Sequence, residues 1–266
     1  QWSEPHRANL AAGLLRVLLD EAREMGEIVG DRVSARTLNP TLWEELLQLG
    51  VVDDQLEEWE QRISRLSQAR PPQAIAPPAA LQAELRPYQQ DGLNWLMFLW
   101  DNELGGILAD DMGLGKTVQT LALIAKVHET RPDARFLVVA PTSVVGNWAA
   151  EARKFLPDLP VATVSATAKR LKKPLPEIIG DARIVVTSYA LLRIDYDAYA
   201  EIDWAGAIFD EGQFLKNHNS QAHQAARKLP APFKLAITGT PMENRIMELW
   251  SLVSITAPGL YSSPKK

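Results

Sequence analysis

The stretch between residues 104 and 120 restricts the fold of this chain more than any other part of its sequence. It begins with a short apolar run, 104–109, suited to a buried strand, and the residues after Thr117 have the apolar spacing of a helix. A glycine-rich turn containing Gly113 and Gly115 joins the two. Such glycines let backbone N–H groups approach phosphate oxygens, and the unpaired amides of a helix N-terminus favour negative charge. The stretch therefore predicts a phosphate-binding loop.

The residue types in this turn predict ATP and magnesium as ligands. Lys116 is expected to reach the terminal phosphates, and the Thr117 hydroxyl is placed to ligate Mg²⁺. The strict form of the motif has glycine five places before Gly115, where this chain has Asp110, which favours the shorter loop of helicase-like motors. The loop residues predicted to contact ATP are Met112, Gly113, Leu114, Gly115, Lys116 and Thr117.

A second motif follows about ninety residues later, where the apolar run 205–209 ends in two carboxylates, Asp210 and Glu211. Alone, this could be an acidic loop after a strand. Beside the phosphate loop it has the form of a Walker B site, in which Asp210 holds magnesium and Glu211 orients and polarises the attacking water. Lys116 and Glu211 are therefore the predicted catalytic residues.

Short apolar runs alternate with helical patterns along residues 81–266, which predicts an α/β fold with a mostly parallel sheet covered by helices on both faces. The expected strands are 106–109, 136–140, 162–165, 184–187, 205–209 and 235–238. One helix is expected to begin near Pro87. The others are expected to span 117–129, 144–155, 190–195, 220–227 and 246–255. Ligands of such sheets bind beyond the carboxyl ends of the strands, which is where the phosphate loop falls.

The first part of the chain has a different composition. Residues 1–68 show apolar residues at helical spacing, which predicts a small all-helical accessory region, and residues 69–80 contain Pro71, Pro72, Pro77 and Pro78, which predicts a semi-rigid linker. The whole net charge of −5 lies in residues 1–80. No motif in this region indicates chemistry, so we expect a packing or regulatory appendage that could dock a protein partner.

Composition excludes several classes of function. The chain has no cysteine, which rules out disulfides and thiolate metal sites and fits a cytoplasmic protein, nucleoid-associated if bacterial. Apolar runs are too short to span a membrane, so no membrane partner is expected. Because residues 81–266 are neutral overall, their net charge does not by itself predict a nucleic-acid partner. One cluster could provide a local basic face or simply a solvated loop: Lys169, Arg170, Lys172 and Lys173.

With both sites placed, residues 81–260 resemble the Swi/Snf family of superfamily-two, helicase-like, DNA-dependent ATPases. Besides the phosphate loop, motif I in that family, four segments resemble its motifs in order: 85–89 the adenine-reading Q motif, 140–148 motif Ia, 186–189 motif Ib and 235–244 motif III. Asp210-Glu211-Gly212-Gln213 stands at motif II, with Gln213 in place of the usual histidine, a variant typical of bacterial members.

The resemblance implies further site residues. Arg86 and Gln89 would bind the base, since the Gln89 amide can both donate to and accept from adenine. Gln213, Thr238 and Thr240 would couple the state of the phosphates to domain closure. The segments implied to face the backbone of double-stranded DNA contain Thr142, Ser143, Trp148, Ser188 and Tyr189. Two of these have alternative interpretations, because Trp148 could belong to the core and Ser188 could cap a helix.

By this resemblance, residues 81–266 are the first RecA-like lobe of an ATP-driven translocase on double-stranded DNA, which remodels or clears protein–DNA complexes. The second lobe, which supplies an arginine to the transferring phosphoryl group in this family, does not appear in the sequence, so we expect weak hydrolysis by the fragment. Two alternatives stay open. One is a nucleotide-switched nucleic-acid-binding or interaction module, and the other is an RNA helicase.

Overall fold

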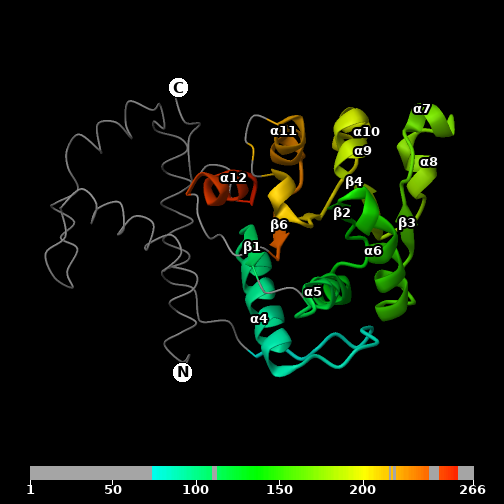
Figure 1. Ribbon diagram of the computed structural model, residues 1–266. Helices are drawn as coiled ribbons and strands as arrows, with labels where there is room; N and C mark the ends of the chain where they lie inside the picture. The colour runs from blue at the N-terminus through cyan, green and yellow to red at the C-terminus, as the bar shows by residue number, and fades with distance from the viewer. Residues whose placement is uncertain (1–73, 110–112, 216, 218–219, 240–245, 257–266) are drawn as a thin grey trace, which may run out of the picture. The chain divides into compact units, whose positions relative to one another are not determined.

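The computed structural model describes residues 74–109, 113–215, 217, 220–239 and 246–256. Six parallel strands form its sheet, in the order β1-β6-β5-β2-β4-β3 (Figure 1). The strands are β1 (Gly106–Ala109), β2 (Phe136–Ala140), β3 (Val161–Thr163), β4 (Ile184–Ser188), β5 (Gly206–Phe209) and β6 (Phe233–Thr238). The carboxyl ends of β1 and β5 therefore meet at one edge, although about a hundred residues separate them in the chain.

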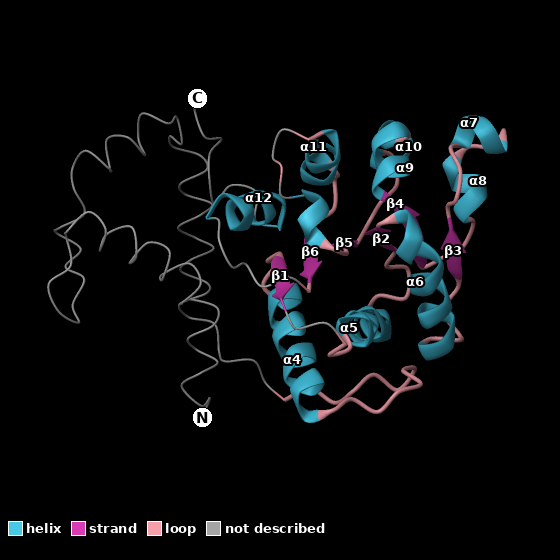
Figure 2. Cartoon of the chain, viewed as in Figure 1, coloured by secondary structure: helices cyan, strands magenta, loops and turns pink. Residues whose placement is uncertain are grey.

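Helices connect each strand to the next and cover both faces of the sheet (Figure 2). The longer ones are α4 (Pro87–Asp101), α5 (Lys116–Thr130), α6 (Thr142–Phe155), α11 (Gln221–Lys228) and α12 (Ile246–Thr256). The shorter ones are α7 (Ala168–Leu171), α8 (Leu175–Ile179), α9 (Tyr189–Ile194), α10 (Tyr196–Ala200) and the 3₁₀ turn η1 (Gly212–Leu215).

Two apolar cores lie on the two faces of the sheet, because successive side chains of a strand point to opposite sides. In β2, Phe136 and Val138 pack with α4, α5 and α6, whereas Leu137 and Val139 pack with α8 to α12. Every residue of β2 and β4 is buried. The continuous apolar runs of the sequence are thus explained by strands that are covered on both faces.

The predicted α/β architecture is confirmed, and β1 and β2 have the predicted bounds. The strand predicted at 162–165 corresponds to β3, which begins one residue earlier and ends two residues earlier, at Val161–Thr163. The prediction also missed α7, α8, α10 and η1. These elements have four or five residues each, too few to complete the periodic pattern from which a helix is recognised.

The described end of the proline-containing segment lies against the domain rather than extending away from it. The backbone N–H of Ile75 donates to the Asn94 side chain in α4, and the Ile75 carbonyl accepts from Gln90. The Ala79 N–H donates to Glu129 in α5. Residues 74–80 of the predicted semi-rigid linker therefore form a strap over α4 and α5. The predicted helical region 1–68 and the start of that linker lie outside the described residues.

No helix among the described residues has both the length and the apolar content that crossing a membrane requires.

Lys234 is a buried cation in β6, with only 4% of its surface exposed. Its Nζ donates to the carbonyls of Ala226 and Arg227 near the end of α11. These carbonyls have no partner inside the helix, so the lysine completes the helix terminus. Burial, together with the charge of Arg227, lowers the pKa of Lys234 from 10.5 to about 8.

We predict that this lysine makes stability depend on pH. Above pH 8 the folded chain loses the Lys234 proton, which the unfolded chain retains up to about pH 10.5. The contribution of this group to the free energy of unfolding therefore rises by about 1–2 kcal/mol between pH 7.5 and 9.5. Urea unfolding at both pH values should show this rise in the wild type and in the exposed control Lys228→Met, but not in Lys234→Met. Parallel pH dependences in all three proteins would contradict the assignment.

Candidate nucleotide-binding site

The glycine-rich turn leads from β1 directly into α5, as the sequence predicts. Gly113 and Gly115 have φ values of +84° and +75°, the left-handed region that glycine adopts without strain. Gly115 is the N-cap residue of α5, and its carbonyl accepts the first helical hydrogen bond from Gln119. The open amides of the first turn and the Lys116 side chain therefore begin at the same point of the chain.

Gln89 in α4 supports the turn from the side. Its Nε2 donates to the Leu114 carbonyl at 3.1 Å, and its Oε1 accepts from the Arg86 backbone N–H at 2.9 Å. An added Cβ at position 115 would lie too close to this Nε2, so any side chain there requires Gln89 to move. Nε2 also donates to the Tyr88 hydroxyl at 3.5 Å, so both of its N–H groups are used and only Oε1 keeps a further position as an acceptor. Its predicted reading of adenine stays a prediction, and its observed role is to join α4 to the loop.

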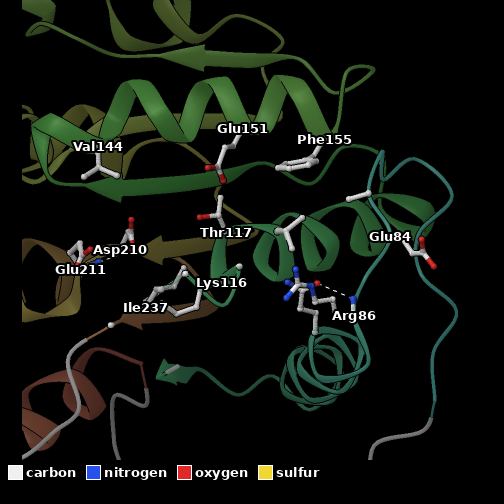
Figure 3. Close-up of a pocket in the computed structure, with 16 residues that line it drawn as sticks. Glu84, Arg86, Lys116, Thr117, Val144, Glu151, Phe155, Asp210, Glu211 and Ile237 are labelled. Atoms are coloured by element: carbon white, nitrogen blue, oxygen red, sulfur yellow. Dashed lines mark hydrogen bonds between the residues drawn. The ribbon is translucent and has the colours of Figure 1, made fainter. Parts of the chain in front are cut away.

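A cavity of about 560 Å³ lies in front of the turn and has the size of a small-molecule site. Figure 3 shows that Asp210 and Glu211 lie toward one end, with Arg86 and Phe155 toward the other and Thr117 between. The residues that line it are Ala83, Glu84, Arg86, Gln89, Gly113, Gly115, Lys116, Thr117, Val118, Val144, Glu151, Phe155, Asp210, Glu211, Ile237 and Gly239. The structure therefore brings both sequence motifs to one cavity.

Hydrogen bonds hold both carboxylate oxygens of Asp210. Its Oδ1 accepts from the Glu211 backbone N–H at 2.8 Å, and its Oδ2 accepts from the Trp148 indole N–H at 2.6 Å. Burial raises the pKa of Asp210, while these two hydrogen bonds and the positive charge of Lys116 act against that rise. The Lys116 ammonium is thus close enough to act on the carboxylate electrostatically.

Glu211 has a left-handed backbone, with φ at +51°, which is unusual for a residue with a side chain. Gln213 Nε2 donates to its carboxylate at 2.5 Å, and the buried Oε1 of Gln213 has no hydrogen-bond partner in the described part of the chain. Strained backbone of this kind persists where surrounding contacts hold it, as at functional sites. The predicted coupling of Gln213 toward motif III stays a prediction, because its described contact is with Glu211.

The donor set fits Mg²⁺ and a triphosphate. Hydroxyl and carboxylate oxygens are the ligands that Mg²⁺ prefers, and the cavity offers Thr117, Asp210 and Glu211. Lys116 and the backbone N–H groups around two left-handed glycines can bind phosphate oxygens. The chemistry of the residues present therefore agrees with the predicted cofactors.

One wall of the cavity was not predicted from the sequence. Val144, Glu151 and Phe155 line it from α6, the helix in which the sequence predicts DNA contacts by Thr142, Ser143 and Trp148 (Figure 3). With Trp148 they lie three or four residues apart, so they occupy one face of the helix. That spacing was visible in the sequence, but periodicity alone does not tell a face that covers the core from one that borders a cavity.

Of the five residues assigned to DNA contact, two are exposed and three are buried. Thr142 and Ser143 are exposed in the first turn of α6, as a DNA contact requires. Ser188 is buried, and its Oγ caps α9 by accepting from the Leu191 N–H, which agrees with the alternative interpretation. Trp148 belongs to the core, which also agrees with its alternative interpretation, and Tyr189 is the fifth residue.

Trp148 and Tyr189 are directed at the Walker B residue and not at the surface. Trp148 is only 1% exposed, and its indole N–H contacts Asp210. The Tyr189 hydroxyl donates to the Asp210 carbonyl at 2.6 Å. Burial and the charges of Asp210 and Glu211 raise the pKa of Tyr189, which keeps the hydroxyl protonated as a donor. The described polar contacts of both side chains are therefore with Asp210, and their contact with DNA stays a prediction.

For three predicted site residues the structure gives no contact that tests their roles. Met112 and Thr240 lie outside the described residues, and Thr238 is buried at the end of β6. Their proposed roles stay predictions.

Comparisons with known proteins agree with this geometry. The family model of the SNF2-related domain matches residues 88–266. That span contains the glycine-rich loop and the acidic pair. The chain belongs to the SNF2-related domain family.

Individual relatives of this SNF2-related chain come from several kingdoms. The TATA-binding protein-associated factor mot1 of Aspergillus fumigatus is 41% identical over 201 residues, which cover 71% of this chain and 10% of that protein. The putative ATP-dependent helicase/translocase YwqA of Bacillus subtilis is 37% identical over 217 residues, covering 80% and 23%. The chain thus spans between a tenth and a quarter of these relatives.

Among solved structures, the SWI2/SNF2 ATPase core of Sulfolobus solfataricus in complex with dsDNA matches with a TM-score of 0.64 and 36% identity. The match covers 72% of this chain and 39% of that one. The RecA-like fold inferred from the resemblance is therefore confirmed.

The environment of the two glycines predicts different effects of substitution. Gly113→Ala and Gly115→Ala each place a side chain in the left-handed region, at about 1–2 kcal/mol. Only Gly115→Ala also overlaps Gln89, since an added Cβ at Gly113 meets open space. Gly115→Ala should therefore lower the free energy of unfolding further. In a double-mutant cycle, Gln89→Ala should cost less in the Gly115→Ala background than in the wild type. Equal effects of the two alanines would contradict a steric role for Gln89.

Proposed function

We propose that this chain is the ATP-binding first lobe of an ATPase that is activated by double-stranded DNA and translocates along it. The observation that carries the proposal is the convergence of Lys116, Thr117, Asp210 and Glu211 on one cavity. The relatives are named as an ATP-dependent helicase/translocase and as a SWI2/SNF2 ATPase core, which supports ATP as the nucleotide.

Each of these side chains has a defined task in hydrolysis. The loop amides and Lys116 bind the phosphates of ATP, and Thr117 with Asp210 would hold Mg²⁺. When bound, Mg²⁺ neutralises charge that develops on the phosphate oxygens. Glu211 orients a water molecule and accepts its proton while the water oxygen attacks the terminal phosphorus. The bond from that phosphorus to the bridging oxygen breaks, which leaves ADP and phosphate.

The DNA-binding part of the proposal rests on the carboxyl edge of the sheet. Thr142 and Ser143 are exposed there, and side-chain hydroxyls commonly position a nucleic-acid backbone without reading sequence. The structural relative in complex with dsDNA supports a duplex as the partner. The basic cluster 169–173 follows β3 at the same edge, and none of its four cations forms an ion pair within the described residues.

Two alternatives are separated by simple tests. A nucleotide-dependent switch needs binding but not turnover, so a full-length protein with Glu211→Gln would keep its function, whereas a translocase would lose it. An RNA helicase would separate short RNA duplexes, which a double-stranded DNA translocase does not do.

The site predicts a clean separation of binding from hydrolysis. Lys116→Ala should weaken the affinity for a fluorescent ATP analogue about 10–100-fold, since it removes a charged partner of the phosphates. Glu211→Gln should retain affinity and lose residual turnover. We also expect slow hydrolysis by the 266 residues alone, because the family's second lobe supplies an arginine worth about 10³–10⁵ in rate. Unchanged affinity in Lys116→Ala, or full DNA-stimulated turnover by this chain, would contradict the proposal.

The basic cluster gives a separate prediction about DNA. Replacing Lys169, Arg170, Lys172 and Lys173 by glutamine should reduce the salt dependence of duplex affinity by about 0.9 in log–log slope for each phosphate that the protein no longer neutralises. The control removes four exposed cations elsewhere: Arg153, Lys154, Arg227 and Lys228. Equal slopes in the two variants, measured by fluorescence anisotropy from 50 to 200 mM salt, would assign the cluster to a solvated loop.

A further inference from the structure

Two buried aromatic residues hold Asp210 from opposite faces of the sheet. Trp148 belongs to the core formed with α4, α5 and α6, and Tyr189 to the core formed with the helices on the other face. The Trp148 indole donates to the Asp210 carboxylate, and the Tyr189 hydroxyl donates to the Asp210 carbonyl, both at 2.6 Å. The residue is therefore fixed through its side chain and its backbone at once.

The strand register explains how this arrangement arises. Ile208 points to the α5 face and Phe209 to the other, so the next side chain, Asp210, returns to the α5 face where α6 brings Trp148. The Asp210 backbone N–H donates to the Val139 carbonyl at the end of β2, which places the residue beside the strand that leads to α6. Tyr189 is the first residue of α9, directly after β4.

The chain contains a second buried Trp and Tyr whose polar groups bond elsewhere. Trp204, equally buried, donates its indole N–H to the Tyr199 carbonyl at 2.7 Å. The Tyr199 hydroxyl lies 2.7 Å from the Thr187 hydroxyl. Trp148 and Tyr189 instead both donate to Asp210, the carboxylate-bearing residue of the proposed metal site. The same chain thus contains a matched pair of aromatics without that partner.

We propose that Trp148 and Tyr189 are positioning residues that fix Asp210 for Mg²⁺ and link the metal site to the first turns of α6 and α9. This inference rests on the proposed function. Hydrogen bonds to a metal-binding carboxylate set its orientation, and their loss commonly weakens metal affinity 10–100-fold. The role is distinct from catalysis, since neither side chain lines the cavity.

Through these two residues, a movement of α6 or α9 at the carboxyl edge of the sheet would reach the proposed metal site. Trp148 lies less than two turns from the exposed Thr142 at the start of α6. Tyr189 stacks at 5.7 Å against the ring of Phe214, which is 54% exposed. A duplex that displaces either helix start would therefore shift Asp210. By linkage, Mg²⁺ bound with nucleotide would change duplex affinity by the same factor.

The first experiment compares Trp148→Phe with Trp204→Phe in the 266-residue chain. Each variant removes one buried indole N–H donor, so their losses of stability should be similar. Mg²⁺ is titrated into the chain with a fluorescent ATP analogue, and nucleotide affinity is also measured in EDTA. Trp148→Phe should weaken the apparent Mg²⁺ affinity about tenfold or more and leave the metal-free nucleotide affinity within about twofold of wild type. Trp204→Phe should change neither.

A second pair protects the test against misfolding of one variant. Tyr189→Phe is compared with Tyr199→Phe, and Mg²⁺ affinity is measured with and without a short DNA duplex. Tyr189→Phe should reduce the effect of the duplex on Mg²⁺ affinity, whereas Tyr199→Phe should preserve it. Thermal unfolding of each variant reports whether the fold is intact.

Two outcomes overturn the inference, and they are distinguishable from failure of the proposed function. If Trp148→Phe and Tyr189→Phe match their controls in Mg²⁺ affinity and in duplex coupling, the two residues are structural only, and the ATP site stands. If the wild-type chain itself binds nucleotide without any dependence on Mg²⁺, the proposed function fails and the inference fails with it.

Discussion

The partial burial of the Asp210 carboxylate at the edge of the cavity is the constraint on which the rest of the site depends. A buried carboxylate tends to take up a proton, and a protonated acid would be a poor ligand for Mg²⁺. The structure opposes this with the Trp148 indole, the Glu211 N–H and the positive charge of Lys116. The parallel sheet brings these groups together, because it places the ends of β1, β2 and β5 at one edge.

The same constraint gives α6 a place in both proposed binding sites. Its exposed first turn lies where a duplex is proposed to bind, whereas one of its faces borders the nucleotide cavity with Val144, Glu151 and Phe155. Trp148 lies on that face but points inward to the acidic residue. If both proposals hold, α6 would respond to both ligands, and a rigid α6 would transmit its displacement without any rearrangement of the core.

Much of this organisation could be predicted from sequence, because it depends on local patterns. The apolar runs predicted the strands, and Gly113, Gly115 and Lys116 predicted the loop. The hydrogen bonds of Trp148 and Tyr189 to Asp210 could not be predicted. They depend on the order of strands in the sheet, which no local pattern contains. Motif resemblance placed both residues near DNA, and only the three-dimensional register directs their polar atoms to Asp210. The short helices α7, α8 and α10 were missed because they span little more than one turn each.

The most direct test of the account is the position of the cation in a crystal of the chain grown with Mn²⁺ and a non-hydrolysable ATP analogue, located by anomalous scattering. The account predicts one strong peak between the Thr117 hydroxyl and the Asp210 carboxylate, next to the terminal phosphates, with the Trp148 indole still hydrogen-bonded to Asp210. A peak away from both side chains, or a nucleotide bound outside the cavity that Lys116 and Asp210 share, would contradict it.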